Sequence, residues 1–546
     1  MLVALNAGYA AIRYVNVNSS DPRSPYVSPE YAARAIQDAV NVSSDGDVIR
    51  VAAGTYNQGG AVAPGHGLTN RVMIPAAIRV ESESGAASTI ISGSGPYGPA
   101  AIRCVYMTNG AELIEFTILG GHTMTNGDFL ADRAGGGLLM DCGGFVSGCV
   151  VQANSANYGA GAFSAGGLIV DSTFANNAAV LSPASGGGAY LVYGALMERC
   201  VVDVNSGHYG AGVFCDLGGE VRDSRISRNN SAQNAGGIFC ASGGLVRASI
   251  VTGNYARIAG GGAYCWNGGT IQNALILRNT ATNGGGVCII GDGRVQSCTI
   301  VTNKANAGGG LYCWGTGVVE NTILYYNAAG YGPNIHHEYG GCSYWYSCMT
   351  PFMANGAGNT ELAPFFVNRA ASDYRLQVSS PCIDQGTNQS WMARQLDLDG
   401  RPRIWINRVD MGAYERNPAS LDADTDGDGV PDWWEWIHFG HVTNVNAGQD
   451  YDGDGYLAGE EFIAGTEPTN SRSFLYLAIE RSGQSGRYLW WPSAASRFYT
   501  VTAFTNLVPL SGDEVITNRM AATPPQNMIA ITQNYERVYF RISVSR

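Results

Sequence analysis

The chain has 546 residues and a net charge of −12, so more than one folded unit is expected and nucleic acid is a poor candidate partner. Glycine contributes 74 residues and proline only 20, while 45% of the residues are apolar, a fraction that excludes a disordered low-complexity chain. No run of about 18 apolar residues is present, so the sequence predicts no transmembrane span.

The chain opens with MLVALNAGYAA, a short apolar run followed by small residues. This segment is consistent either with the remainder of a secretion signal that has lost its basic beginning or with an ordinary N-terminal arm. Ser28-Pro29-Glu30 then predicts a helix start, with Ser28 as the N-cap and Pro29 in the first turn. Ala33, Ile36 and Val40 would share one face of this helix, which we expect to cover the N-terminal end of the fold.

A repeat of about 24 residues dominates the middle of the chain. The segment 46–56, GDVIRVAAGTY, reads as the first coil, and less regular coils are expected up to residue 134. The third glycine of a glycine-rich triplet, or its equivalent, recurs at Gly137, Gly161, Gly188, Gly212, Gly237, Gly262, Gly286 and Gly310. Asparagine recurs with the same period at Asn205, Asn229, Asn254, Asn279, Asn303 and Asn327.

Each repeat reads as a glycine turn, a short strand, a second glycine turn, another strand and then asparagine. The strands are rich in Val, Ile and Tyr and are too short for helices, and no helical segment separates them. One coil cannot bury its own apolar face, so coils must stack about 4.8 Å apart, with like residues above one another. We therefore predict a parallel β-helix with asparagine side chains hydrogen-bonded in a ladder.

The 13 cysteines fall mostly at repeated positions inside apolar strands, which favours packed free thiols. Cys342 and Cys348 lie in a loop-like stretch and are the best candidates for a disulfide.

Strand alternation predicts an outward-facing row of aromatic residues, because the residues on either side of each are small or aliphatic and should face inward. Such a row could stack on the sugar rings of an extended polysaccharide, unless it is internal or covered by another segment. The residues of the row are Phe163, Tyr190, Phe214, Phe239, Tyr264 and Tyr312, with Trp266 and Trp314 on the same face.

Two segments match the calcium-loop pattern D-x-D-x-D-G-x5-E. Hard oxygen ligands spaced in this way, with glycine at the sharp bend, suit Ca²⁺, whereas the alternative is a solvated acidic linker without metal. The predicted ligands are Asp424, Asp426, Asp428, Asp432 and Glu435 in the first segment, and Asp450, Asp452, Asp454 and Glu461 in the second. The expected role of the ion is to stiffen the junction, since clustered carboxylates repel one another.

Two stretches carry a family resemblance. AIQDAVNVSSDGDVIRVAAGTY, followed by GGG-x-aromatic repeats, resembles bacterial right-handed parallel β-helix proteins of the polymorphic membrane protein type. LAPFFVNRAASDYRLQVSSPCIDQGT, with DLDGRPRI and VDMGAYE, resembles the end of "choice-of-anchor" surface proteins, and the DGDG segments resemble thrombospondin type 3 or EF-hand calcium loops. The resemblance covers roughly residues 12–416 and implies a secreted or surface-displayed bacterial protein, without a particular reaction.

The expected fold is all-β: a right-handed, single-stranded parallel β-helix with an N-terminal capping helix, a calcium-binding linker and a small C-terminal antiparallel β domain. The strand-like runs FLYLAIE, RYLWWPS, RFYTVTAF and YFRISVS predict that last domain. The predicted segments are an arm and capping helix (1–45), the β-helix (46–350), its C-terminal end and cap (351–417), the calcium segment (418–472) and the β domain (473–546).

Three functions fit the sequence. The first is a non-enzymatic cell-surface or secreted protein, adhesin-like or structural, that binds an extracellular polysaccharide or the cell envelope. The second is a polysaccharide lyase or glycoside hydrolase of the β-helix fold, but the regular coils have no adjacent Asp pair and Lys304 is the sole lysine. The third is a subunit of an extracellular assembly, including a homo-oligomer.

Overall fold

The computed structural model describes residues 10–404, 408–416, 424–443, 445–482, 486–494, 497–504, 506–507, 510–511, 514–522, 526–531 and 539–545. The expected remainder of a secretion signal therefore lies almost wholly outside the described residues. The chain divides into two compact units, Met1–Arg416 and Asn417–Arg546. Within the described residues, no helix is long and apolar enough to cross a membrane.

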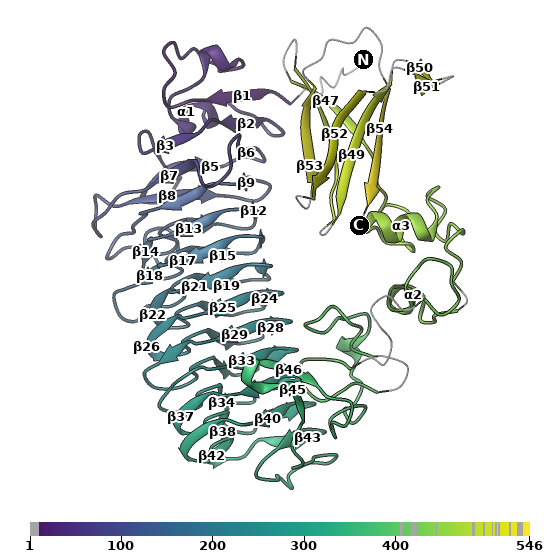
Figure 1. Ribbon diagram of the computed structural model, residues 1–546. Coiled ribbons are helices and arrows are strands. Elements are labelled where there is room, and N and C mark those ends of the chain that lie inside the picture. Colours follow the sequence, from purple (N-terminus) through teal and green to yellow (C-terminus); the bar gives the residue numbers. More distant parts are fainter. Residues whose placement is uncertain are drawn as a thin grey trace, which may run out of the picture. The chain divides into compact units, whose positions relative to one another are not determined.

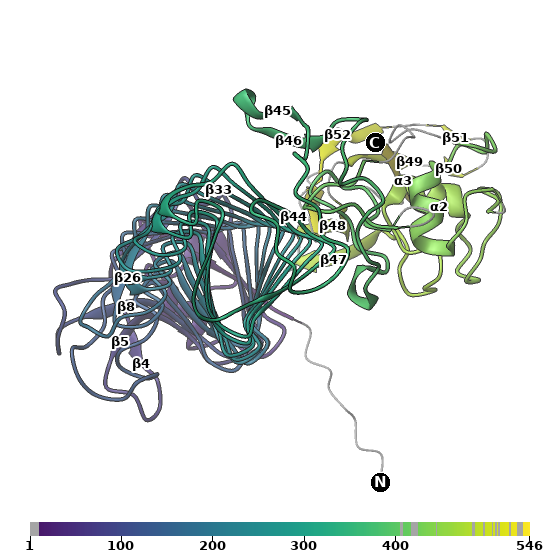
Figure 2. The ribbon, with the colours of Figure 1, turned by 90° about the horizontal axis from the view of Figure 1, so that it is seen from below.

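The first unit is a parallel β-helix, as the repeat predicts. Three long sheets run along it, and each strand pairs with its equivalent one coil further on (Figure 1). Viewed along the stack, the coils superpose closely (Figure 2). We name the sheets A, B and C in the order in which the chain visits them.

Sheet A consists, in order, of β1 (Ile12–Val15), β2 (Val48–Val51), β6 (Arg79–Ser82), β9 (Glu112–Ile114), β12 (Phe145–Ser147), β16 (Leu168–Val170), β20 (Leu196–Glu198), β24 (Glu220–Arg222), β28 (Leu245–Arg247), β32 (Thr270–Gln272), β35 (Arg294–Gln296), β39 (Val318–Glu320) and β43 (Ser343–Trp345).

Sheet B consists of β3 (Gly54–Tyr56), β7 (Thr89–Ser92), β10 (Thr117–Leu119), β13 (Val150–Gln152), β17 (Thr173–Ala175), β21 (Val201–Asp203), β25 (Arg225–Ser227), β29 (Ile250–Thr252), β33 (Leu275–Leu277), β36 (Thr299–Val301), β40 (Ile323–Tyr325) and β44 (Cys348–Met349).

Sheet C consists of β4 (Ala61–Val62), β5 (Thr69–Ile74), β8 (Ile102–Met107), β11 (Leu138–Met140), β15 (Ala162–Ala165), β19 (Ala189–Val192), β23 (Val213–Cys215), β27 (Ile238–Ala241), β31 (Ala263–Trp266), β34 (Val287–Gly291), β38 (Leu311–Gly315) and β42 (Ile335–Gly340). Shorter strands between sheets B and C form a minor sheet of β14 (Ser155–Ala156), β18 (Ala178–Ala179), β22 (Ser206–Tyr209), β26 (Asn230–Asn234) and β30 (Tyr255–Ala256), and a pair of β37 (Lys304–Ala307) and β41 (Ala328–Tyr331).

The asparagine ladder is confirmed and is longer than predicted. Asn254 is representative: its backbone N–H and its Nδ2 both donate to Oδ1 of Asn279, at 2.9 and 3.0 Å, and Nδ2 also donates to the carbonyl of Ile226 at 3.0 Å. Its own Oδ1 accepts the corresponding bonds from Asn229. Buried amides are thus fully satisfied from coil to coil. Besides the six predicted asparagines, the ladder contains Asn154, Asn177 and Asn334.

The glycine repeat has two physical causes. Gly260 has φ +69°, a conformation that glycine adopts without strain. At Gly262, a Cβ atom would lie 2.6 Å from the carbonyl oxygen of Gly286 and 2.8 Å from Nδ2 of Asn279. The close approach of the next coil and of the asparagine ladder therefore requires glycine at this position.

The N-terminal end is covered by a shorter helix than predicted. The segment splits into a 3₁₀ turn, η1 (Pro29–Tyr31), and a short helix, α1 (Ile36–Val40), and the Ser28 side chain makes no capping bond. The break arises because Ala33 pairs with Val15 of β1 as an isolated parallel bridge. Ala33, Ile36 and Val40 nevertheless all lie in the main apolar core.

The chain after the last coil folds back along the outer face of sheet B. We name residues 361–404 and 408–416 the side cap; it contains β45 (Phe366–Asn368), η2 (Arg369–Ala371), β46 (Asp373–Leu376) and η3 (Ser390–Met392). Polar bonds also hold it at the turns between sheets A and B: Asn321 Nδ2 donates to the carbonyl of Thr387, and Asn273 Nδ2 to that of Leu396, both at 2.9 Å. The shared apolar cluster consists of Leu275, Leu277, Val301, Ile323 and Cys348 from the coils and Phe366, Tyr374, Leu376, Cys382 and Met411 from the side cap.

The disulfide prediction was wrong. Cys342 bonds to Cys313, and Cys348 is free and buried. Cys313 lies in β38, one coil before Cys342, so stacking brings the two together although they are distant in sequence. The prediction of packed free thiols is confirmed, since every other cysteine is free and all of these except Cys142 are buried.

The second unit contains two short helices, α2 (Asp432–Phe439) and α3 (Ala458–Ala464), and an antiparallel β domain. One sheet of the domain has the order β47 (Ala478–Ser482), β48 (Gly486–Pro492), β53 (Gln526–Ile531), and the other β52 (Glu514–Ala521), β49 (Phe498–Phe504), β54 (Tyr539–Ser545). A two-residue pair, β50 (Asn506–Leu507) and β51 (Leu510–Ser511), is separate from both sheets.

Candidate functional site

The two acidic loops each gather three carboxylates. Asp424, Asp426 and Asp428 offer oxygen atoms that all lie within 4.8 Å of one another, and Asp450, Asp452 and Asp454 do the same. Gly429 and Gly455, the sixth residues of the two loops, have φ +94° and +96° and form the bend that turns these side chains inward. Such a concentration of carboxylate oxygen can hold a metal ion.

Asp424 and Asp450 hold equivalent positions in the two loops. The carboxylate of Asp424 accepts the N–H groups of Gly427 at 2.8 Å and Gly429 at 2.9 Å. Asp450 accepts those of Gly453 and Gly455 at 2.7 and 2.9 Å. Backbone donors therefore set the orientation of the first carboxylate in each loop.

A buried glutamate closes each loop from the helix that follows. Glu435 of α2 and Glu461 of α3 are 0% and 1% exposed. Within the described residues, both carboxylate oxygens of Glu435 and Oε2 of Glu461 have no hydrogen-bond partner. Burial and the neighbouring aspartates raise the pKa of Glu435 to about 8 and that of Glu461 to about 7. An unpartnered buried carboxylate beside three others is unfavourable unless a cation or a proton neutralises it.

The residues fit a hard divalent cation such as Ca²⁺, because every donor is a carboxylate oxygen. One predicted ligand is engaged elsewhere: Asp432 accepts the N–H and the hydroxyl of Thr425, at 2.6 and 2.7 Å. Asp432 is not part of the three-oxygen group. Asp432 has the sequence spacing of a ligand, but it lies at the start of α2, where its carboxylate bonds to Thr425 of the loop.

The two loops form one small unit with a shared core. Val430, Trp434, Ala458 and Phe462 are buried together, so that α2 and α3 pack through their apolar faces. Asp428 also accepts the N–H of Ala447, which precedes the second loop, at 2.6 Å. The loops are therefore coupled through packing and through one carboxylate.

The aromatic row faces outward from the core, as predicted, since the main core cluster contains Val213 and Cys215 but not Phe214 between them. The row as a whole is not an open stripe of ring faces. Consecutive rings from Phe163 to Tyr264 stack on one another with centroids 4.6 to 5.1 Å apart. The coil spacing nearly equals a ring-stacking distance, so each ring face is covered by the next coil.

Most members of the row are consequently buried or half-buried. Phe163, Phe239 and Tyr312 are buried, and Tyr158 and Tyr209 pack edge-on against Tyr190 and Phe239. The remaining members, Tyr190, Phe214 and Tyr264, are half-buried. This part of the predicted binding surface is a structural stack.

Trp266 and Trp314 are exposed, at 43% and 51% of their surface. They share one register line: Trp266 pairs with Ile290, Ile290 with Trp314, and Trp314 with Tyr339, which is 75% exposed. Sequence reasoning missed Tyr339, because a register shift between Cys313 and Trp314 moves the pairing by one residue. Simple counting by the repeat places Glu338 there. We name Trp266, Ile290, Trp314 and Tyr339 the aromatic line.

A groove of about 710 Å³ lies at the turns between sheets C and A in the earlier coils. Glu112, Asp141, Phe145 and Tyr193 are among the residues that line it. Both carboxylates are engaged: Glu112 pairs with Arg79 at 2.7 Å, and Asp141 accepts the hydroxyl of Tyr106 at 3.0 Å.

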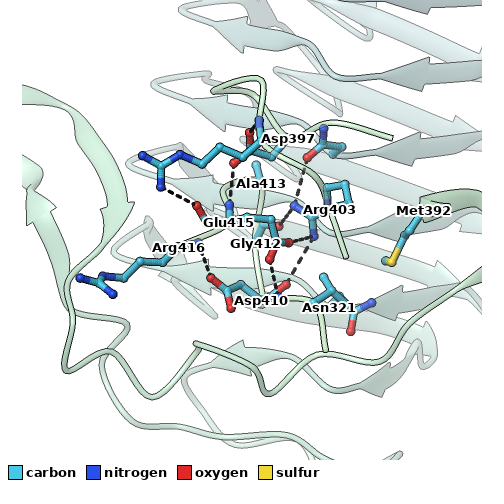
Figure 3. Close-up of polar contacts among 12 residues, drawn as sticks. Asn321, Met392, Asp397, Arg403, Asp410, Gly412, Ala413, Glu415 and Arg416 are labelled. Carbon is cyan, nitrogen blue, oxygen red and sulfur yellow. Dashed lines mark hydrogen bonds and ion pairs between the residues drawn. The ribbon is translucent and has the colours of Figure 1, made fainter. Parts of the chain in front are cut away.

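A buried charge network lies inside the side cap (Figure 3). Arg403, 0% exposed in its side chain, pairs with Glu415 at 3.0 Å and donates to the carbonyl of Gly412 at 3.0 Å. Asp410 and Asp397 accept backbone N–H groups around it, including those of Arg416 and Glu415. Burial raises the pKa of Asp410 to about 6 and that of Glu415 well above its ordinary value. Because these charged side chains are buried and bonded to one another within the side cap, the network stabilises the fold and is not accessible to a substrate.

No family model matches the chain, and no curated protein matches it. Among solved structures, the chain is similar to pectate lyase Pel9A, with 15% identity, a TM-score of 0.41 and coverage of 75% of this chain and 98% of that one. It is also similar to the A-module of mannuronan C-5 epimerase AlgE4 of Azotobacter vinelandii, with 14% identity, a TM-score of 0.32 and coverage of 63% and 99%. A third similar structure is XylC in complex with xylose, with 9% identity, a TM-score of 0.29 and coverage of 97% and 100%. Likenesses this distant carry no argument about function.

Proposed function

We propose that the chain is a secreted or cell-surface scaffold without catalytic activity, whose C-terminal unit is ordered by Ca²⁺. The observation that carries this proposal is the pair of buried glutamates, Glu435 with both carboxylate oxygens unpartnered and Glu461 with Oε2 unpartnered, each beside three clustered aspartates. A bound divalent cation would neutralise each group and remove the repulsion among its carboxylates.

Calcium in the second loop would also secure the β domain, because α3 joins the two. Glu461 lies on this helix beside the loop, while Ala464 packs in the core of the β domain with Leu475 and Trp491. Arg497 of the β domain donates to the carbonyls of Phe462 and Ile463 at the end of α3, at 2.9 and 2.6 Å. Ordering α3 therefore stabilises both of its neighbours.

Calorimetric titration of the full chain with Ca²⁺, and with Mg²⁺ for comparison, tests the proposal. We expect Ca²⁺ to bind, to raise the melting temperature of the C-terminal unit, and to be removed by a chelator. The double variant E435Q/E461Q should lose this response. E467Q is the matched control, because Glu467 is exposed and lies only six residues from Glu461. Absence of calcium binding by the wild-type chain would refute the proposal.

The aromatic line supports extended polysaccharide as the partner of the solenoid. Trp266 and Trp314 lie two coils apart, about 9.6 Å at the usual strand spacing, and each exposes a large apolar surface of the kind that stacks on sugar rings. Affinity electrophoresis against a panel of soluble polysaccharides tests this, with W266A/W314A as the variant. Y255A is the control, because Tyr255 is exposed to a similar extent, 46%, but lies in β30 of the minor sheet, outside sheet C. Particle size with and without chelator tests self-association in the same preparations.

A polysaccharide-cleaving enzyme is the second candidate function, and the groove that contains Glu112 and Asp141 favours it. Paired carboxylates on adjacent coils are what a glycoside hydrolase needs. Release of reducing ends or of unsaturated uronate from the same polysaccharide panel, abolished in E112Q, would replace the first proposal by this one.

A further inference from the structure

Cys348 and Cys382 come from two segments that meet only in the folded chain. Cys348 is in β44, the last strand of sheet B, and Cys382 is in the side cap. Both are 0% exposed and belong to one apolar cluster. Cys348 faces away from the main core, since its neighbour Met349 belongs to the main core and Cys348 does not. The side chain of Cys348 is therefore directed toward the side cap.

Backbone contacts hold Cys382 at the same place. The N–H of Met411 donates to the carbonyl of Cys382 at 2.9 Å, and a Cβ on the next residue, Gly412, would lie 2.8 Å from the side chain of Ile323. Ile323 is the register partner of Cys348. The Cys348 thiol donates to the carbonyl of Leu362 in the side cap at 3.2 Å, and the neighbouring Cys382 thiol raises the pKa of Cys348.

We propose that Cys348 and Cys382 form a second disulfide, which joins the side cap to the last coil. A small disulfide such as oxidised glutathione serves as the oxidant. The two protein thiols give up two protons and two electrons as the new S–S bond forms, and the glutathione disulfide takes them up and is released as two thiols.

A comparison within the chain explains why this pair would oxidise and another would not. Cys215 and Cys240 also contact each other, but they are register partners inside the main core. Only unfolding of the stacked coils exposes them. The side cap has few regular elements, so local opening admits a small oxidant to Cys382.

Peptide mapping of the folded, full-length chain after incubation with oxidised glutathione tests the proposal. Trypsin cleaves after Lys304, Arg369, Arg375 and Arg394, so Cys313, Cys342 and Cys348 share the peptide 305–369 and Cys382 lies in 376–394. The Cys313–Cys342 bond is internal to the first peptide. We expect the two peptides to be linked without reductant and separate with it. The oxidised protein should also have two fewer free thiols than the protein in which Cys348 and Cys382 are reduced.

Two variants and a control identify the bond. C348S and C382S should each abolish the linkage, whereas C265S, a buried thiol of the main core, should retain it. Closing the loop should also slow proteolysis of the side cap at least about tenfold in the oxidised protein. Separate peptides in the oxidised wild-type chain would overturn the proposal even if a variant fails to fold. A linkage that survives in C348S would assign Cys382 to another partner and also overturn it.

Discussion

The β-helix and the two acidic loops both bury polar side chains, but they differ in how the hydrogen bonds of those side chains are satisfied. In the solenoid, each ladder asparagine is neutral and both donates to and accepts from its neighbours, as Asn254 does with Asn279 and Asn229. In the loops, Glu435 and Glu461 are carboxylates, which only accept hydrogen bonds, and they lie beside other carboxylates. The hydrogen bonds of the solenoid ladder are therefore complete without a ligand, whereas the carboxylates of the loops are neutralised only by a cation or a proton.

The side cap is intermediate between these two regions. It buries three carboxylates, but Arg403 supplies one positive charge and backbone N–H groups supply the remaining donors. The three regions thus differ in what offsets the cost of burying polar groups. In the solenoid it is hydrogen bonds from neighbouring coils, in the side cap it is an internal arginine, and in the acidic loops it would be an external ion. Four experiments test this difference between the regions.

Asn254→Asp should have the largest effect, because it places an acceptor-only charge in a ladder that needs donors. Both hydrogen bonds donated by Nδ2 would be lost. We expect a loss of about 5 kcal/mol in the stability of the solenoid near neutral pH, and a smaller loss in acid, where the aspartate is protonated and neutral. Chemical unfolding followed by circular dichroism measures this. Asn306→Ala, at an exposed asparagine two coils further on, is the control and should be nearly neutral.

Arg403→Met should come next. It removes the buried cation but leaves Glu415 and Asp410 in place. Breaking a buried ion pair in this way costs about 3–5 kcal/mol. Hydrogen exchange should show faster opening of the side cap, with the exchange of coils before residue 250 unchanged. Equal protection of the side cap in the variant and the wild type would show that the network contributes little.

Glu435→Gln with Glu461→Gln should separate repulsion from ion binding. In the wild type, we expect Ca²⁺ at a hundredfold excess over its dissociation constant to stabilise the folded unit by about 2.7 kcal/mol. In the double variant, we expect no calcium response but, without metal, a stability equal to or above that of the wild type, because two buried charges are gone. Tryptophan fluorescence during thermal unfolding with and without chelator measures both. A metal-free variant that is less stable than the metal-free wild type would contradict this explanation.

The side cap should also weaken as pH rises through mildly acidic values. Burial raises the pKa of Asp410 from 3.8 to about 6 in the folded chain. As pH rises, the Asp410 carboxyl therefore loses its proton at a lower pH in the unfolded chain than in the folded chain. The stability contributed by the neutral acid is complete below about pH 4 and is lost as pH rises to about 6, by an amount on the order of 2 kcal/mol. Proteolysis of the side cap across this range measures the effect. D410N should flatten the profile, whereas a profile unchanged by D410N would assign the titration elsewhere.

The repeating part of the molecule could be predicted well from sequence. A period of about 24 residues places equivalent residues one coil apart, so the asparagine ladder and the outward direction of Phe214 follow from spacing alone. The aspartate clusters follow equally from loop spacing, because each aspartate in them lies two residues from the next.

The non-repeating contacts required the tertiary structure. The pairing of Cys313 with Cys342, the adjacency of Cys348 and Cys382, and the register shift that puts Tyr339 beside Trp314 each depend on where a segment leaves the repeat. The exposure of the aromatic residues was also undecidable from spacing, because it depends on ring stacking between coils.

The amino-acid sequence by itself determined the β-helix, its coil length and the two acidic loops. Each of these features follows from a regular spacing of residues, and a regular backbone geometry converts that spacing directly into position. Only the tertiary structure decided which outer faces are covered, which thiols meet and which carboxylates are buried without a partner. Those features depend on how the side cap packs on sheet B and how α2 packs against α3, and no local period encodes such contacts.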